Sequence, residues 1–309
     1  MRREGSIFPV GDIKERLSNI LPKLESFIAP HYIGKLHDSG EGMDIKVDLS
    51  LNVIRDYPLK DNVNKNGALE IYKLPVENSP RLRYIMGIDP YDDDHSTTNS
   101  LGSCFVFDMF TDQVVAEYTG RPRTANEFYD NCLRIAQFYN ALINYENDKK
   151  GLFAYFSNAN ALHYLCDTPE ILKDMDYVKG NNYGNKAKGT PSGKMINMWA
   201  RRLQADYMIE PHTYENEEGN EIITNKLSTI RSIGYLKECE QWNPDGNADR
   251  VSAMGMLMIL RESLQKVQIK EFEEGLNRIE NDPFWDRPFN KNIYANKFPL
   301  SKKVSYFQR

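Results

Sequence analysis

The sequence has no long apolar run, and this absence argues against a membrane-spanning protein. No segment approaches the roughly 18 to 20 consecutive apolar residues that a membrane-spanning helix needs. The arginines near its start are not followed by the apolar core of a signal peptide. We therefore expect a cytoplasmic protein with no membrane partner.

Clustered cysteines and histidines are also missing. The four cysteines lie far apart, form no Cys-x-x-Cys pair and mostly fall inside apolar runs: Cys104, Cys132, Cys166 and Cys239. This spacing predicts reduced, buried thiols and argues against a zinc site. The five histidines are too scattered to form a ligand set.

What the chain does contain is an ordinary globular composition. Of its 309 residues, 40% are hydrophobic and 27% are charged, enough for one large domain or two modest ones. The net charge of −5 argues against uniform coating of nucleic acid, but it permits a local basic groove beside an acidic site. We find no internal repeat and no low-complexity tract.

The hydrophobic pattern changes near Arg81. Before it, one amphipathic stretch from Ile13 to Leu24, interrupted by Pro22, precedes short apolar segments that predict small strands. After it, Tyr84–Asp89 has the pattern of a buried strand, stopped by Pro90. We predict a connecting region over 1–80, a main domain over 81–265, and a helix with a basic tail over 266–309.

The main domain alternates strand and helix patterns. Thr124-Ala-Asn-Glu127 has the form of a capping box, and the residues after it repeat at helical spacing. This order predicts an α/β fold in which a mixed sheet is flanked by helices, with the N-terminal strands and helix as an extension. The expected elements are strands at 84–89 and 141–145, hairpins at 103–118 and around 215–221, and helices from 124, over 151–165, 194–207, 227–240 and 247–264.

Three carboxylates fall where these elements meet connections. Asp89 and Glu146 end two expected strands, and they would lie side by side if those strands pair in parallel. Asp249 begins a nearly apolar helix whose small residues permit close packing on a sheet. Acids gathered at such a site repel one another unless a divalent metal is bound.

Such a set of hard oxygen ligands suits Mg²⁺ or Mn²⁺. The chemistry it predicts is two-metal phosphodiester hydrolysis, in which one ion activates water and the other stabilises the leaving 3′ oxygen. Asp89 would bridge both ions, while Glu146 and Asp249 would each complete one shell. Asp245 is a fourth candidate ligand.

Each acid also has a structural alternative. Asp89 precedes proline, a pair that favours turns, and Glu146 could cap the helix that follows it. Asp249 is a common type of first-turn acid, which interacts favourably with the helix dipole. The combination and order of the three, rather than any one of them, favour the metal site.

Together these residues resemble the nuclease domain of tailed-phage terminase large subunits, of the crAss-like phage type and the RNase H-like superfamily. The resemblance spans about residues 81 to 265. It is carried by Gly87-Ile-Asp-Pro90, Val114-Val-Ala-Glu-Tyr118, Gly120-Arg-Pro122, Glu146-Asn147 with Gly151, and Asn247-Ala-Asp249.

The resemblance implies that the three acids hold two metal ions and cut double-stranded phage DNA during packaging in an infected bacterial cell. It also implies three partners, namely the terminase ATPase domain, the portal and the small terminase subunit. No phosphate-binding Gly-x-x-x-x-Gly-Lys-Ser/Thr loop is present, because the segment from Gly189 to Met195 has the wrong spacing and ending. A motor would therefore be supplied from outside this sequence.

A basic stretch beside glycines is the candidate DNA contact. It could hold phosphates without recognising sequence, although a solvated helix face explains it equally well. Its members are Lys186, Lys188, Lys194, Arg201 and Arg202.

Other functions remain open at this level. An RNase H-like resolvase or transposase would cut structured junctions selectively, because one fold carries many activities. A non-catalytic DNA-docking module would use the same acids structurally. An actin-like ATPase or sugar kinase is disfavoured, because its second phosphate loop is missing from the sequence.

Overall fold

The computed structural model describes residues 6–25, 32–40, 42–60, 63–92, 100–173, 187–216, 218–244 and 246–280. Two compact units are distinguished, Met1–Ser263 and Leu264–Arg309. Of the predicted site residues, Asp245 and Lys186 lie outside the described residues, as does the basic tail beyond residue 280.

A seven-stranded mixed sheet is the centre of the first unit, in the order β2-β1-β3-β6-β5-β4-β7. Every pairing in it is antiparallel except that of β4 with β7. This confirms the expected α/β fold class, a mixed sheet flanked by helices. The strands are β1 (Tyr32–Asp38), β2 (Met43–Val47), β3 (Leu69–Ile71), β4 (Tyr84–Asp89), β5 (Gly102–Asp108), β6 (Gln113–Gly120) and β7 (Leu142–Tyr145).

Helices connect and cover these strands, and a separate hairpin pairs β8 (Pro211–Glu215) with β9 (Glu221–Asn225). None of the described helices combines the length and the apolar character needed to cross a membrane. The helices are α1 (Val10–Glu25), α2 (Ala125–Tyr139), α3 (Lys150–Asn158), η1 (Leu162–Tyr164), α4 (Glu170–Lys173), α6 (Lys194–Ile209), η2 (Lys226–Thr229), α7 (Ile233–Gln241) and α8 (Asp249–Glu280).

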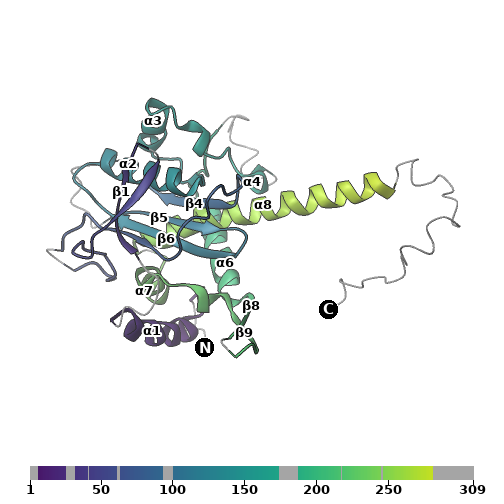
Figure 1. Cartoon of the computed structure of the whole chain (residues 1–309), viewed down its shortest axis with the longest axis horizontal. Coiled ribbons are helices and arrows are strands. Elements are labelled where there is room, and N and C mark those ends of the chain that lie inside the picture. The colour runs from purple at the N-terminus through teal and green to yellow at the C-terminus, as the bar shows by residue number, and fades with distance from the viewer. Residues whose placement is uncertain are drawn as a thin grey trace, which may run out of the picture. The chain divides into compact units, whose positions relative to one another are not determined.

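Strand β5 shows why the sheet is covered on both faces. Its residues alternate in direction, so Cys104 and Val106 join the core cluster that includes residues of α2. The intervening Phe105 packs on Tyr235 of α7, with ring centroids 5.7 Å apart, and the next aromatic, Phe107, packs on α6. All of these residues are fully buried, so helices lie on the two sides of the sheet (Figure 1).

Several local predictions are confirmed. The hairpin of β5 and β6 forms, and the Thr124 side chain accepts a hydrogen bond from the Glu127 N–H at 3.2 Å, as expected of a helix cap. The four cysteines are free and buried. The strands expected from the region before residue 81 also form, and they extend the same sheet beyond β6. The division at residue 81 stays a prediction.

Several element boundaries differ from the prediction, including that of α8, which continues to Glu280 rather than ending at 264. Helix α1 continues through Pro22 and ends three residues later, at Glu25. The helix expected over 151–165 ends at Asn158, because Asn160 adopts a left-handed backbone with φ of 52°. The helix expected over 227–240 is divided in two, because the Ser232 side chain caps α7 by accepting from the Tyr235 N–H at 3.1 Å.

Candidate metal-binding site

The parallel pairing of β4 with β7 places two of the three predicted acids at one edge of the sheet. Ile88 is in register with Tyr145, and the Glu146 N–H continues the ladder by donating to the Ile88 carbonyl at 3.3 Å. Asp89 and Glu146 are therefore the next residues on adjacent strands. Residues in register point to the same face, about 4.8 Å apart, so both carboxylates leave the sheet on the same side.

Helix α8 lies on that same side and brings the third acid close. Asn144, two residues before Glu146, donates from Nδ2 to the Met256 carbonyl of α8 at 2.8 Å. Gly87, two residues before Asp89, lies against the α8 backbone, so that a Cβ added to it would be 2.5 Å from the Leu257 nitrogen. With α8 held on this face, Asp249 at its first position comes within electrostatic range of Asp89.

The close contact between Gly87 and the α8 backbone leads to a prediction about the stability of the protein. We expect Gly87→Ala to destabilise the protein by about 1–3 kcal/mol or more, because the new methyl group would push α8 off the sheet. Urea unfolding followed by circular dichroism measures the change. Gly193→Ala is the control, since an added Cβ there meets nothing within 4 Å. Equal stability of Gly87→Ala and the wild type would contradict the packing described.

Asp89 is a buried carboxylate with an unsatisfied oxygen. The residue is 7% exposed, and its Oδ1 has no hydrogen-bond partner among the described residues. Burial, and then the charges of Asp249 and Glu146, raise its pKa well above the ordinary value, and the Lys149 cation, 3.9 Å away, opposes this. A buried acid in this state is stabilised by any cation that binds to it.

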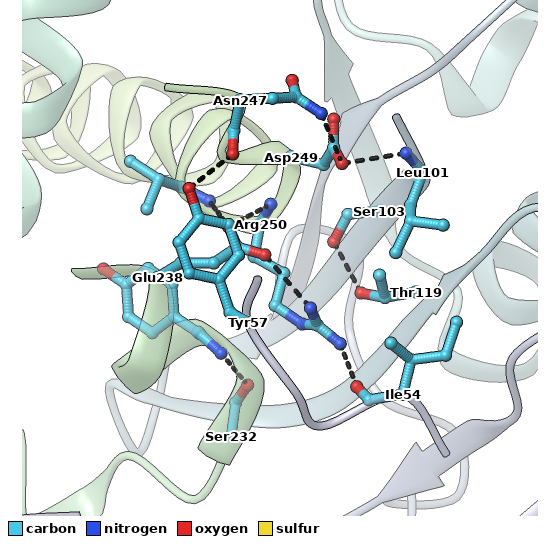
Figure 2. Close-up of polar contacts among 12 residues, drawn as sticks. Ile54, Tyr57, Leu101, Ser103, Thr119, Ser232, Glu238, Asn247, Asp249 and Arg250 are labelled. Carbon is cyan, nitrogen blue, oxygen red and sulfur yellow. Dashed lines mark hydrogen bonds and ion pairs between the residues drawn. The ribbon is translucent and has the colours of Figure 1, made fainter. Parts of the chain in front are cut away.

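Asp249 is held in a fixed orientation by three donors. Its Oδ1 accepts from the Ser100 hydroxyl at 3.0 Å, and its Oδ2 accepts from the Leu101 N–H at 2.8 Å and from the Asn247 amide at 3.2 Å. Figure 2 shows the Leu101 and Asn247 contacts converging on one oxygen. Burial raises the pKa of Asp249, while these hydrogen bonds lower it. A lone pair of Oδ1 is left for a further ligand.

Glu146 is oriented by a segment that follows α4. The Ser192 hydroxyl donates to Glu146 Oε1 at 2.5 Å, and the Thr190 backbone forms a bridge beside Glu146. The Ser192 N–H in turn donates to Asp148 at 3.0 Å. The segment from Gly189 to Lys194, which lacks the pattern of a phosphate-binding loop, thus serves here to support the carboxylate.

Beneath Asp249 lies a buried ion network. Arg250 is 2% exposed and pairs through Nε with Glu117 at 2.6 Å and through Nη1 with Glu238 at 3.1 Å. Its Nη2 also donates to the Ile54 carbonyl (Figure 2). The other oxygen of Glu238 accepts the N–H groups of Arg250 and Val251, at 2.9 and 3.2 Å, and so caps the start of α8. This network fixes the helix end that carries Asp249.

The side-chain positions do not form a ready-made metal cage. Among the described residues, no group of three acid, histidine or cysteine side chains is arranged to hold one ion. Asp249 and Glu146 also accept hydrogen bonds from hydroxyl and N–H donors of the protein. Asp89 Oδ1, which accepts no hydrogen bond from the described residues, and the oxygen-only donor set nevertheless fit a hard divalent cation.

Comparisons with known proteins find solved structures of low similarity to this chain. Among solved structures, the chain is similar to the large terminase nuclease of thermophilic phage G20c at 13% identity and a TM-score of 0.32, covering 62% of this chain and 88% of that one. The zinc-bound form of that nuclease gives 9% identity, a TM-score of 0.40 and the same coverage. The large terminase nuclease domain of Thermus phage P74-26 gives 12% identity and a TM-score of 0.25, over 58% of this chain and 89% of that one.

No protein-family model and no curated protein matches the sequence. Because the TM-scores lie below 0.5, the fold class rests on the sheet order and pairing of this chain. The function is inferred from its own residues.

The predicted DNA-contact residues do not form one free surface. Lys188 is engaged with Asp167 at 2.8 Å and with the Leu165 carbonyl. Arg201 is half-buried, with its guanidinium 5.3 Å from the Trp242 ring centroid. Lys194 and Arg202 are the exposed members, both on α6.

Sequence reasoning missed the residues that orient the acids. Lys149, three positions after Glu146, donates to the Pro90 carbonyl at 2.7 Å and supplies the cation beside Asp89. Lys149 directly precedes α3, which begins with a second lysine, and this pair is only a weak sign in the sequence of a functional cation. Ser100, Ser192 and Glu238 give no such signal, because each reaches its partner only through the tertiary fold.

Proposed function

We propose that this chain is a metal-dependent endonuclease acting on double-stranded DNA, with Mg²⁺ or Mn²⁺ at the site of Asp89, Glu146 and Asp249. The observation that carries the proposal is the buried Asp89 carboxylate, whose Oδ1 accepts no hydrogen bond from the described residues and whose pKa is raised by burial and by the two other acids. Perturbed carboxylates of this kind cluster at functional sites. We further propose, from the sequence resemblance, that it is the nuclease domain of a crAss-like phage terminase large subunit.

In the proposed reaction the three acids divide the binding of two ions. Asp89 would be the shared ligand, because the charges of both other acids act on it, and Glu146 and Asp249 would each contribute a further ligand. Divalent cations bound there would lower the pKa of an attacking water and stabilise the leaving 3′ oxygen. Ser192 and the Asn247 amide hold their carboxylates in orientation, as outer partners of metal ligands do. The Lys149 ammonium lies 3.9 Å from Asp89, so it would compete with a metal ion for that carboxylate.

DNA would be held through its phosphates by the exposed cations of α6. We expect Lys194→Ala and Arg202→Ala each to weaken duplex binding and to reduce the slope of log affinity against log salt by about 0.9. Fluorescence anisotropy in metal-free buffer measures both. Lys46→Ala is the control, because this exposed lysine lies on β2, at the opposite edge of the sheet from β7. Unchanged slopes in both α6 variants would remove them from the proposed DNA surface.

The test of the function compares substrates with Mn²⁺ and with EDTA. A terminase-type nuclease should cut supercoiled and linear duplex with little sequence preference. A resolvase or transposase would favour a four-way junction or a specific end. Strong preference for the junction would replace the terminase proposal with that alternative.

A non-catalytic DNA-docking module is the second candidate, because the acids already have hydrogen-bond donors of their own in the fold. It predicts no cleavage with Mg²⁺ or Mn²⁺. Since an isolated nuclease can be slow when nothing holds the DNA in place, the assay is repeated with the proposed partners, a terminase ATPase domain, the small subunit and the portal. Inactivity under all these conditions would favour the docking module.

A further inference from the structure

Residues 54–57, from the region before β3, lie against the start of α8 and the end of α7. The Ile54 carbonyl accepts from Arg250, and the Tyr57 carbonyl accepts from the Gln241 amide at 2.9 Å. Between them, Asp56 accepts from the Lys237 ammonium at 3.0 Å. The sequence positions of these partners differ by about 180 to 200 residues, so the contact is a tertiary one that joins the N-terminal region to the candidate site.

Tyr57 adds a direct connection to the metal-binding side chains. Its hydroxyl donates to the Asn247 carbonyl at 2.7 Å, and the amide of the same Asn247 donates to Asp249 Oδ2 at 3.2 Å. Figure 2 shows this path running from the Tyr57 ring through Asn247 to the Asp249 carboxylate. Asn247 precedes the first residue of α8, so it is not held by the bonds within that helix.

A cavity beside Tyr57 and Asn247 leaves their orientation to depend on the hydrogen bond between them, because packing on that side is incomplete. A space of about 230 Å³ is lined by Tyr57, Asn247 and Asp249, among other residues. Side chains that border such a space are free to move into it unless polar contacts hold them. Burial, and then the charges of Glu238 and Asp249, raise the pKa of Tyr57, so its hydroxyl stays protonated and remains a donor.

We propose that Tyr57 is a positioning residue of the metal site, which acts through Asn247 to hold the Asp249 carboxylate in the orientation that binds a divalent cation. The inference rests on the proposed function. It makes the region before residue 81 a working part of the nuclease site.

Mn²⁺ binding to the full chain tests this without relying on cleavage. Electron paramagnetic resonance of free Mn²⁺ measures the affinity of the wild type, Tyr57→Phe and Tyr214→Phe. Tyr57→Phe removes one oxygen and should weaken Mn²⁺ binding about tenfold, the lower end of the loss seen for outer partners of metal ligands. Tyr214→Phe is the matched control, because this tyrosine is exposed on β8, and it should bind as the wild type does.

A double-mutant cycle separates positioning from a general loss of structure. If Tyr57 acts through the Asn247 side chain, Tyr57→Phe has no further effect on Mn²⁺ affinity in an Asn247→Ala background. Circular dichroism shows whether each variant is folded, and Asn247→Ala alone should also bind Mn²⁺ about tenfold more weakly.

The outcomes are distinguishable. If the wild type binds Mn²⁺ and Tyr57→Phe binds it equally well, the role of Tyr57 is overturned and the proposed function stands. The same holds if the affinity losses of Tyr57→Phe and Asn247→Ala simply add in the double variant. A wild type that binds no Mn²⁺ overturns the proposed function together with this inference.

Discussion

Replacing Asp89 by asparagine should abolish Mn²⁺-dependent DNA cleavage and, at the same time, stabilise the metal-free protein. Metal ions supply several kcal/mol of transition-state stabilisation, so losing the ligand that binds both is expected to slow cleavage by about 10³-fold or more. Stability should change in the other direction, because the substitution removes a buried charge that repels Asp249 and Glu146.

The pH dependence follows from the sign of the shift. Burial and the neighbouring acids raise the folded-state pKa of Asp89 above its unfolded value. The contribution of its neutral form to stability is therefore fully present below the unfolded pKa and is lost as pH rises through the folded pKa. In EDTA, the melting temperature of the wild type should fall relative to that of Asp89→Asn as pH rises across this window.

Thermal unfolding in EDTA at a series of pH values, beside a plasmid-nicking assay in Mn²⁺, measures both effects. Asp44→Asn is the control, because Asp44 is exposed on β2 and should change neither quantity. Asp89→Asn that cleaves like the wild type, or that is less stable than the wild type at neutral pH, would show that Asp89 has a structural role only.

Arg250→Met should be among the most destabilising single substitutions in this protein. It leaves Glu117 and Glu238 buried, at 4% and 3% side-chain exposure, without their shared cation. Breaking a buried ion pair by removing one partner costs about 3–5 kcal/mol, because the remaining charge is uncompensated. Urea unfolding measures this loss, and nuclease activity should fall with it, because the start of α8 carries Asp249.

A control variant and a rescue variant test whether the loss in Arg250→Met comes from the buried acids. Arg202→Met removes an exposed arginine and should change stability by no more than about 0.5 kcal/mol. Adding Glu117→Gln and Glu238→Gln to Arg250→Met neutralises the stranded acids and should restore part of the loss. A small effect of Arg250→Met alone, or no recovery in the triple variant, would contradict the network as described.

The sequence was sufficient to predict the elements that carry the acids. Asp89 ends a run of apolar residues before a proline, and Glu146 follows a short strand, so both positions follow from local pattern. Their adjacency depends on parallel pairing, which was a hypothesis from the fold class and is confirmed by the register of β4 and β7. Asp249 was placed correctly in the first turn of its helix. The metal-binding role of all three remains a prediction.

The supporting contacts could not be predicted, because they join distant parts of the chain. The partners of Arg250 are Ile54, Glu117 and Glu238, which come from three separate elements or connections. No local pattern distinguishes such residues from other acids. The contacts of the basic stretch were equally out of reach, since Lys188 and Arg201 contact Asp167 and Trp242 in the fold; their role in DNA binding stays a prediction.

The central claim is that Asp89, Glu146 and Asp249 bind divalent cations at one edge of the sheet. Anomalous diffraction from a Mn²⁺-soaked crystal tests it most directly. Our account predicts manganese peaks within coordination distance of Asp89, shared with Glu146 on one side and Asp249 on the other. Manganese absent from these carboxylates, with their side chains still bonded to Ser192, Ser100 and Leu101, would contradict it.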